Sequence, residues 1–349
     1  MKPANQTMLS DLPLRRRVGA MYALLFCINV TAWLWAWTVL RAHPALLGTA
    51  FLAYSFGLRH AMDADHIAAI DNVTRKLMND GERPVTVGFY FALGHSATVV
   101  AGAVIVALAT RALSHYFDAF RETGAMLGTI VSASFLLMIG VINVVLLGGL
   151  IRSFRQLRNG GARDEVDLRV ADFEGNVLAR LFRPLFRMIR SSWLMLPLGV
   201  LFGLGFETAT EVALLGTSAS QASAGLSMWT ILAFPALFAA GMLTIDTTDG
   251  ILMVGAYGWA YVKPQRKLYY NLTITLLSTA VALLVGAIEA LGLIGEQFGL
   301  TGTLWQFVGM LNDNFGMLGY AIVALFIGGW MVSALVYRLK GYDREPVSA

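Results

Sequence analysis

The stretch GLRHAMDADHIAAIDN, from Gly57 to Asn72, places a cluster of ionisable side chains in a region that is otherwise apolar enough to cross a membrane. The cluster consists of Arg59, His60, Asp63, Asp65, His66 and Asp71. Each charge at the centre of a membrane helix costs about 2.5 to 3.5 kcal/mol on insertion scales. So many ionisable groups need partners inside the membrane, and the stretch therefore indicates a functional site.

The composition around this stretch is that of a membrane protein. Of 349 residues, 57% are apolar and only 14% are charged, against about 25% charged in soluble proteins. Apolar stretches of about 20 residues or more, long enough to cross the bilayer core, cover residues 18–40, 45–70, 84–110, 125–151, 193–217, 228–262, 268–294 and 315–337. Because strand-like alternation is absent and lipid cannot satisfy backbone groups, we predict an all-α integral membrane protein with about eight transmembrane helices.

The distribution of basic residues predicts the orientation. With the N-terminus inside, the outer segments hold only Arg41, Arg111 and Arg121, and nearly all other Lys and Arg residues are on the inner side. This asymmetry follows the positive-inside rule and predicts cytoplasmic N- and C-termini in the cytoplasmic (inner) membrane. The net charge of +4 is then explained by topology and by contact with the lipid bilayer, and no nucleic-acid partner is expected.

The chain divides into two predicted four-helix halves. The first covers residues 1–151 and carries the histidine-rich motif, and the second covers residues 193–349. The charged segment 152–192 between them is too short to form a core, and we expect a cytoplasmic linker with a surface helix around residues 177–189. Cys27 is the single cysteine, so a metal ion would be held by nitrogen and oxygen atoms.

Three further predicted spans carry ionisable side chains. The third span contains His95, and the fifth and sixth each contain a pair of carboxylates at helical spacing, Glu207 with Glu211 and Asp246 with Asp249. Because each group needs a partner within the membrane, the second, third, fifth and sixth spans are predicted to be neighbours.

Helical geometry groups the residues of the second span. If residues 45–70 form one continuous helix with about 100° between residues, His60, Asp63 and His66 share one face. Arg59 falls on that face and could balance the negative charge, whereas Asp65 falls nearly opposite unless the helix unwinds there. Imidazole and carboxylate ligands favour Ni²⁺, Co²⁺ or Zn²⁺ over Mg²⁺ or Ca²⁺, and this geometry does not choose among the three.

Simpler explanations exist for some of these residues. A lone histidine in a membrane helix more often packs than binds metal, and the short motif around His95 also suits close helix packing. Glu207 and Glu211 could pair with Arg59, and Asp246 and Asp249 could bond to neighbouring threonines. Four His and Asp residues within seven positions, from His60 to His66, favour a metal site nonetheless.

At these residues the sequence resembles a known family. RHAMDADHI, with His60, Asp65 and His66 in an H-x4-D-H arrangement, resembles the signature of the nickel/cobalt transporter family (NiCoT) of bacterial permeases. LGHSATVV, LGFETATEV and GMLTIDTTDG resemble its other three membrane motifs, in the same order. In two places the sequence departs from the family pattern, with Glu207 where Asp is usual and Ala97 where a small hydroxyl residue is usual, and the first leaves the metal preference open.

The resemblance implies a transporter that imports Ni²⁺ or Co²⁺ as its substrate across the cytoplasmic membrane, through a single polypeptide without an ATPase subunit or a bound cofactor. In this interpretation His60, Asp63, Asp65 and His66 capture the ion and His95 completes its ligand shell. The acidic pairs of the fifth and sixth spans then form a second carboxylate station or tune the charge.

Other interpretations stay open at this point. A weak likeness between the segments beginning at Phe56 and Phe202 suggests an inverted repeat, as in many secondary transporters. An exporter, or a proton-coupled carrier of another solute, would use the same residues. A membrane-embedded metalloenzyme is disfavoured because the sequence has no H-E-x-x-H motif, and we expect a permease rather than an enzyme.

Overall fold

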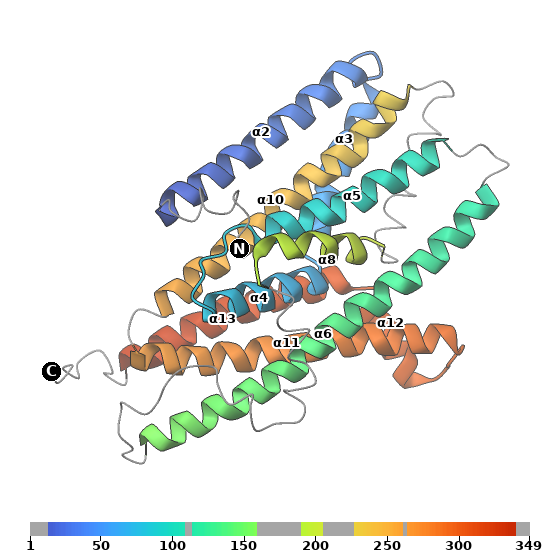
Figure 1. The fold of residues 1–349 in the computed structure, drawn as a ribbon. Coiled ribbons are helices and arrows are strands. Elements are labelled where there is room, and N and C mark those ends of the chain that lie inside the picture. Colours follow the sequence, from blue (N-terminus) through green and yellow to red (C-terminus); the bar gives the residue numbers. More distant parts are fainter. Residues whose placement is uncertain (1–12, 109–113, 159–189, 205–226, 261–263, 340–349) are drawn as a thin grey trace. The chain divides into compact units, whose positions relative to one another are not determined.

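The computed structural model describes residues 13–108, 114–158, 190–204, 227–260 and 264–339 (Figure 1). Within these ranges the regular secondary structure is entirely helical. The helices are α2 Leu14–Leu40, α3 Ala45–His60, α4 Ala64–Asn79, α5 Val87–Leu108, α6 Ser114–Arg158, the short 3-10 helix η2 Ser192–Leu194, α8 Met195–Phe202, α10 Met228–Ala260, α11 Pro264–Gln297, α12 Thr303–Asn312 and α13 Phe315–Leu339.

Several of these helices are long and apolar enough to cross a membrane. Five qualify, Leu14–Leu40, Val87–Val104, Met126–Gly149, Met228–Gly258 and Leu272–Gln297. The pair Thr303–Asn312 and Phe315–Gly329, bent by 74°, brings the number to six if it counts as one span. Large apolar side chains such as those of Phe26, Trp229 and Met317 point outward, as lipid contact requires. For the described part of the chain the helical membrane fold is therefore confirmed, and the number eight and the orientation of the termini stay predictions.

The predicted second span is not one continuous helix, and that prediction was wrong. Helix α3 ends at His60, and α4 begins at Ala64 after a short break. Asp63 has an extended backbone (φ −68°, ψ 150°) and occupies the N-cap position of α4, where Asp is a preferred residue type, although its side chain makes no capping hydrogen bond. Its carbonyl oxygen accepts the N–H of Ile67 at 3.2 Å. The sequence therefore starts a new helix at the point where a continuous helical face was assumed.

Other predictions fall partly or wholly outside the described residues. Helix α6 continues to Arg158, several residues into the predicted linker, and the surface helix expected around residues 177–189 lies outside the described ranges. The fifth span is described only as far as residue 204, so Glu207, Glu211 and most of the second copy of the suspected inverted repeat also lie outside.

The chain forms two compact units, each assembled from three separate segments. The first unit combines Met1–Met62, Glu82–Ser132 and Ser191–Ile251. Its helices approach closely through glycines: a Cβ atom at Gly57 in α3 would meet the backbone of Phe238 in α10, and one at Gly94 in α5 would meet the carbonyl of Leu196 in α8. Such close contact through small residues is the usual packing of membrane helices, and α5 and α8 accordingly run side by side (Figure 1).

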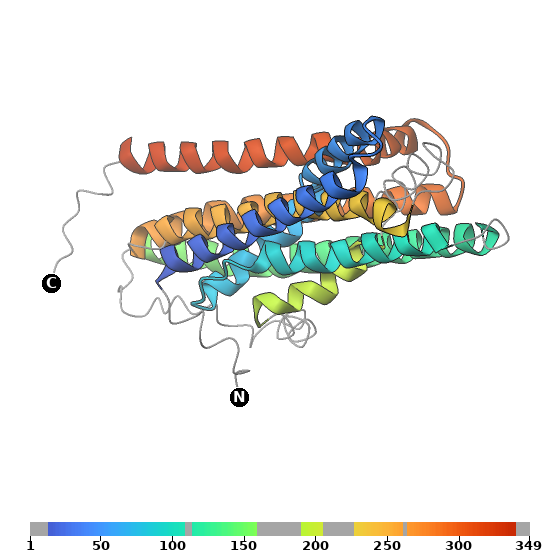
Figure 2. The same ribbon diagram turned by 90° about the horizontal axis from the view of Figure 1, so that it is seen from above.

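The second unit combines Asp63–Gly81, Ala133–Arg190 and Leu252–Ala349. Helix α4 packs on α11 and α13, and α11 and α13 lie alongside each other as long rods (Figure 2). Gly140 of α6 and Gly286 of α11 bring these two helices into contact. All residues of α4 from His66 to Met78 are buried, although this helix carries several charged side chains.

Candidate metal site

The imidazole rings of His60 and His95 face each other inside the first unit. Their Nε2 atoms are 3.1 Å apart, and the ring centroids are 4.9 Å apart with the planes inclined at 69°. His60 is the last residue of α3 and His95 lies in the middle of α5, and both side chains are almost fully buried. The two buried Nε2 atoms thus face each other across a short gap.

The distance between these nitrogens suits a shared metal ion. Transition-metal bonds to imidazole are about 2.0 to 2.1 Å long, so two ligands at a right angle lie about 2.9 Å apart and two at the tetrahedral angle about 3.3 Å apart. The observed 3.1 Å falls between these values. Without metal, one Nε2 donates a hydrogen and the other accepts it, so a metal ion bound by both requires that hydrogen to move to Nδ1 or to leave.

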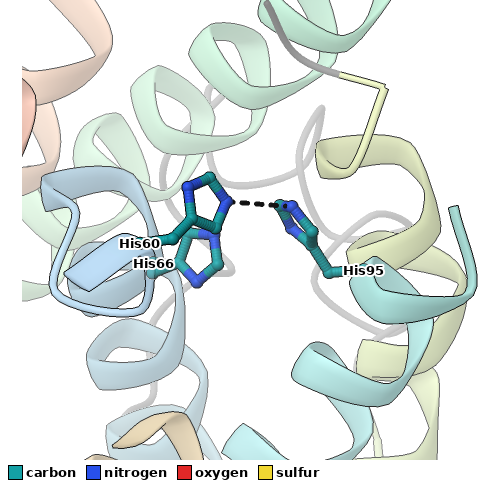
Figure 3. Close-up of side chains that lie close together, drawn as sticks. All are labelled: His60, His66 and His95. Atoms are coloured by element: carbon teal, nitrogen blue, oxygen red, sulfur yellow. Dashed lines mark hydrogen bonds between the residues drawn. The ribbon is translucent and has the colours of Figure 1, made fainter. Parts of the chain in front are cut away.

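His66 is the third member of a group of histidines that could hold a metal ion. His66 follows His60 by six residues, lies in the first turn of α4 and is fully buried. One ligand nitrogen from each of His60, His66 and His95 lies within 4.8 Å of the other two. Figure 3 shows the rings of His60 and His66 on one side of a common space and that of His95 on the other. Three neutral imidazoles are a ligand set suited to Ni²⁺, Co²⁺ or Zn²⁺.

Phenylalanine rings surround the histidine pair within the first unit. The ring of Phe238 lies 5.5 Å from that of His60, and the ring of Phe91 lies 6.1 Å from that of His95. Phe91 also packs at 5.3 Å against Phe202 of α8. These apolar rings offer no ligand atoms of their own, so an ion bound at the buried pair relies on the imidazole nitrogens.

The break after His60 places His60 at the end of one helix and His66 near the start of the next. The C-terminal end of a helix carries partial negative charge, which favours a cation, and His60 lies at that end of α3. The N-terminal end of α4 carries partial positive charge, and two acidic residues stand there, Asp63 and Asp65. The Oδ1 atom of Asp65 accepts the backbone N–H of His66 at 2.8 Å, which ties one carboxylate oxygen to the start of the helix.

The predicted carboxylate ligands that the structure describes are not part of the histidine group. Among the described residues, the group that could hold a metal ion contains no carboxylate, although Asp63 is buried and Asp65 is half-buried. On α10, Asp246 is fully buried and Asp249 is half-buried. The side chain of Arg59 is exposed, and the carboxylates proposed to pair with it on the fifth span lie outside the described residues.

The geometry also shows polar residues that the sequence did not single out. Asn72 and Arg75 of α4 are buried and hydrogen-bonded to each other, to Asn143 and to Thr275. In this region only Asp71 belongs to the cluster that the sequence marks as a functional site. The spacing of Asp71 and Arg75, one helical turn apart, was the available signal.

The comparisons with known proteins agree with a transport function. Residues 46–336 match the family described as high-affinity nickel-transport protein. The chain is 56% identical to the high-affinity nickel transport protein of Cupriavidus necator, over 96% of this chain and 95% of that protein. It is 48% identical to the hydrogenase nickel incorporation protein HupN of Bradyrhizobium diazoefficiens (92% and 84%) and 42% identical to the cobalt transport protein NhlF of Rhodococcus rhodochrous (86% and 85%). No solved structure matches the chain.

The matching family and these relatives are transport proteins, so this protein is a transporter and not an enzyme, as predicted. The chain belongs to the high-affinity nickel-transport protein family, which confirms the resemblance seen in its four motifs.

Proposed function

We propose that the protein imports Ni²⁺ or Co²⁺ across the cytoplasmic membrane and binds the ion through His60, His66 and His95 on its way. The observation that carries this proposal is the group of three buried imidazoles with ligand atoms within 4.8 Å of one another. The names of its relatives, which include nickel and cobalt transport proteins, support these two ions as the substrate.

The carboxylates of the membrane motifs have supporting roles in this proposal. Asp63 and Asp65 stand at the start of α4 and lower the electrostatic cost of bringing a divalent cation to three neutral ligands. Asp246 and Asp249, together with Glu207 and Glu211, provide a second station for the ion or balance its charge. Arg59 is a counter-charge for the acidic residues when the ion is absent.

The membrane potential can drive this import without an ATPase subunit. A divalent cation that moves inward gains about 4.6 kcal/mol for each 100 mV, at about 2.3 kcal/mol per charge. The proposal includes eight membrane-spanning segments in two halves joined by a cytoplasmic linker, with both termini in the cytoplasm.

Uptake of radioactive Ni²⁺ and Co²⁺ tests the proposal in cells that lack their own importer. We expect uptake with the wild-type chain, loss of uptake with His95→Ala, and normal uptake with His43→Ala, because His43 is exposed between α2 and α3. Membrane levels of each variant are measured in parallel. Normal uptake by correctly inserted His95→Ala protein would refute the proposed site.

Purified protein in liposomes tests the energy source. With an inside-negative potential and no nucleotide present, we expect Ni²⁺ to accumulate inside the liposomes. Accumulation that requires added ATP and a second subunit would refute the single-polypeptide proposal.

A further inference from the structure

A network of buried polar side chains fastens one face of α4 to its neighbours within the second unit. The Nη1 atom of Arg75 donates to Oγ1 of Thr275 in α11, and its Nη2 atom donates to Oδ1 of Asn72, both at 3.2 Å. Asn143 of α6 donates to the same oxygen of Asn72 at 2.6 Å. The hydroxyl of Tyr257 in α10 donates to Asp71.

These contacts come from three different helices and are shielded from solvent. The side chains involved each expose 2% or less of their surface. We call them the α4 network: Asp71, Asn72, Arg75, Asn143, Tyr257 and Thr275. Because burying polar groups at this depth is unfavourable unless they are bonded, α4 rests in the rotation that satisfies these bonds. A different rotation would break several of them at once.

The network residues on α4 lie on the side of the helix that faces away from His66. With about 100° between successive residues, Asp71, Arg75 and Asn72 lie about 140°, 180° and 240° around the helix from His66. The three network residues on α4 therefore occupy one face, and His66 projects from the opposite one. Fixing the first face fixes the direction in which the imidazole of His66 points.

The position of an imidazole ligand is sensitive to this rotation. Side-chain atoms lie about 5 to 6 Å from a helix axis, so a rotation of about 10° moves them by about 1 Å. Metal-ligand distances tolerate only about 0.2 Å. A small loss of restraint on α4 is therefore enough to remove His66 from a shared ligand shell.

We propose that the α4 network positions His66 for metal binding, and that Arg75 and Asn72 act on the metal site without touching the ion. This inference rests on the proposed function, because it takes His66 to be a ligand. Arg75 is central since two of its nitrogens serve two different partners, which the single ammonium nitrogen of lysine cannot do in the same geometry.

The test compares Co²⁺ binding by the purified full-length wild type, Arg75→Lys and Tyr257→Phe. Titration with CoCl2 gives the Kd, and X-ray absorption spectroscopy of the bound ion counts its imidazole ligands. We expect three imidazoles in the wild type and two in Arg75→Lys, with a Kd raised about tenfold or more, the range seen when residues that orient metal ligands are removed. Tyr257→Phe, a milder change, is expected to raise the Kd in the same direction and serves if Arg75→Lys does not fold.

Thr74→Val is the matched control. Thr74 is equally buried on α4, and its hydroxyl makes no hydrogen bond among the described residues, so the Kd and the three imidazoles should be unchanged. Network variants that melt earlier but keep the wild-type Kd and three imidazoles would show a purely structural role and overturn the inference alone. A wild type that binds no Co²⁺ would overturn the proposed function and this inference with it.

Discussion

The backbone of Phe238 lies directly against Gly57, so α3 and α10 touch through main-chain atoms only three residues before His60. The ring of the same Phe238 packs 5.5 Å from the ring of His60. One residue of α10 thus sets both the approach of α3 and the surroundings of its terminal histidine. Backbone packing and ligand placement are coupled at this crossing.

Replacement of Gly57 by alanine should therefore weaken both folding and metal binding. A methyl group at this position meets backbone atoms, which cannot turn aside as a side chain would, and such overpacking typically costs about 1 to 3 kcal/mol. We expect a lower melting temperature and a higher Kd for Ni²⁺. Gly48→Ala in the same helix is the control, because nothing lies within 4 Å of the added atom. Equal melting and binding by the two variants would contradict the proposed coupling.

Metal binding should weaken as the pH is lowered from about 8 to below about 6. An imidazole must be neutral to bind a metal, so protons compete with the ion. Because three imidazoles take part, we expect the logarithm of the binding constant to change more steeply with pH than for one proton. Isothermal titration at a series of pH values measures this slope. His66→Ala should show weaker binding and a shallower slope than His43→Ala, and identical slopes for these two variants would argue against His66 as a ligand.

Two substitutions of Asp65 separate its structural role from its charge. Asp65→Asn keeps an oxygen that can accept the N–H of His66, whereas Asp65→Ala removes it and should cost about 1 kcal/mol of stability, the usual net contribution of one hydrogen bond. Both remove the negative charge and should weaken Ni²⁺ binding. Melting curves without metal and Ni²⁺ titrations together test this. Full Ni²⁺ affinity in Asp65→Asn would mean that only the hydrogen bond matters.

The proposed topology predicts opposite labelling of two surface positions. Cys27 is first replaced by alanine, and a single cysteine is then introduced at His43 or at Asp80, both of which are exposed. A maleimide that cannot cross membranes should label His43→Cys in intact cells and should label Asp80→Cys only after the cells are opened. Labelling of Asp80→Cys from outside would reverse or reject the proposed orientation.

The sequence predicted the helical membrane fold and included His60, His66 and His95 among its candidate ligands, because both inferences depend on residue type and local spacing. Long apolar runs identify α2, α5, α10 and α11 with small errors at their ends. The cost of burying imidazoles and carboxylates in lipid marked these histidines as candidate ligands together with six carboxylates, and the sequence alone did not separate the two kinds of residue.

The break after His60 is the main structural feature that the sequence did not predict. Residues 45–70 are apolar enough to suggest one continuous helix. His66 was therefore placed on the same helical face as His60, although α3 ends at His60 and His66 belongs to the next helix. Asp63 was interpreted as a ligand, although Asp is also a preferred helix N-cap, the position it occupies in the structure. The partners of Asn72 and Arg75 could not be predicted either, because Asn143 and Thr275 are far away in the sequence and helix packing alone brings them together.

The polar composition of α4 affects how the chain inserts into the membrane during synthesis. It carries Asp71, Asn72, Arg75 and Lys76, and it is buried against α11 and α13, which are synthesised near the end of the chain. Alone, a segment this polar is not retained in lipid by the insertion machinery. We therefore expect a water-soluble cysteine reagent to reach α4 in chains that stop after α10 and not in complete chains. Helix α4, which carries His66, would then be among the last segments to reach its final packed position, although it is synthesised early.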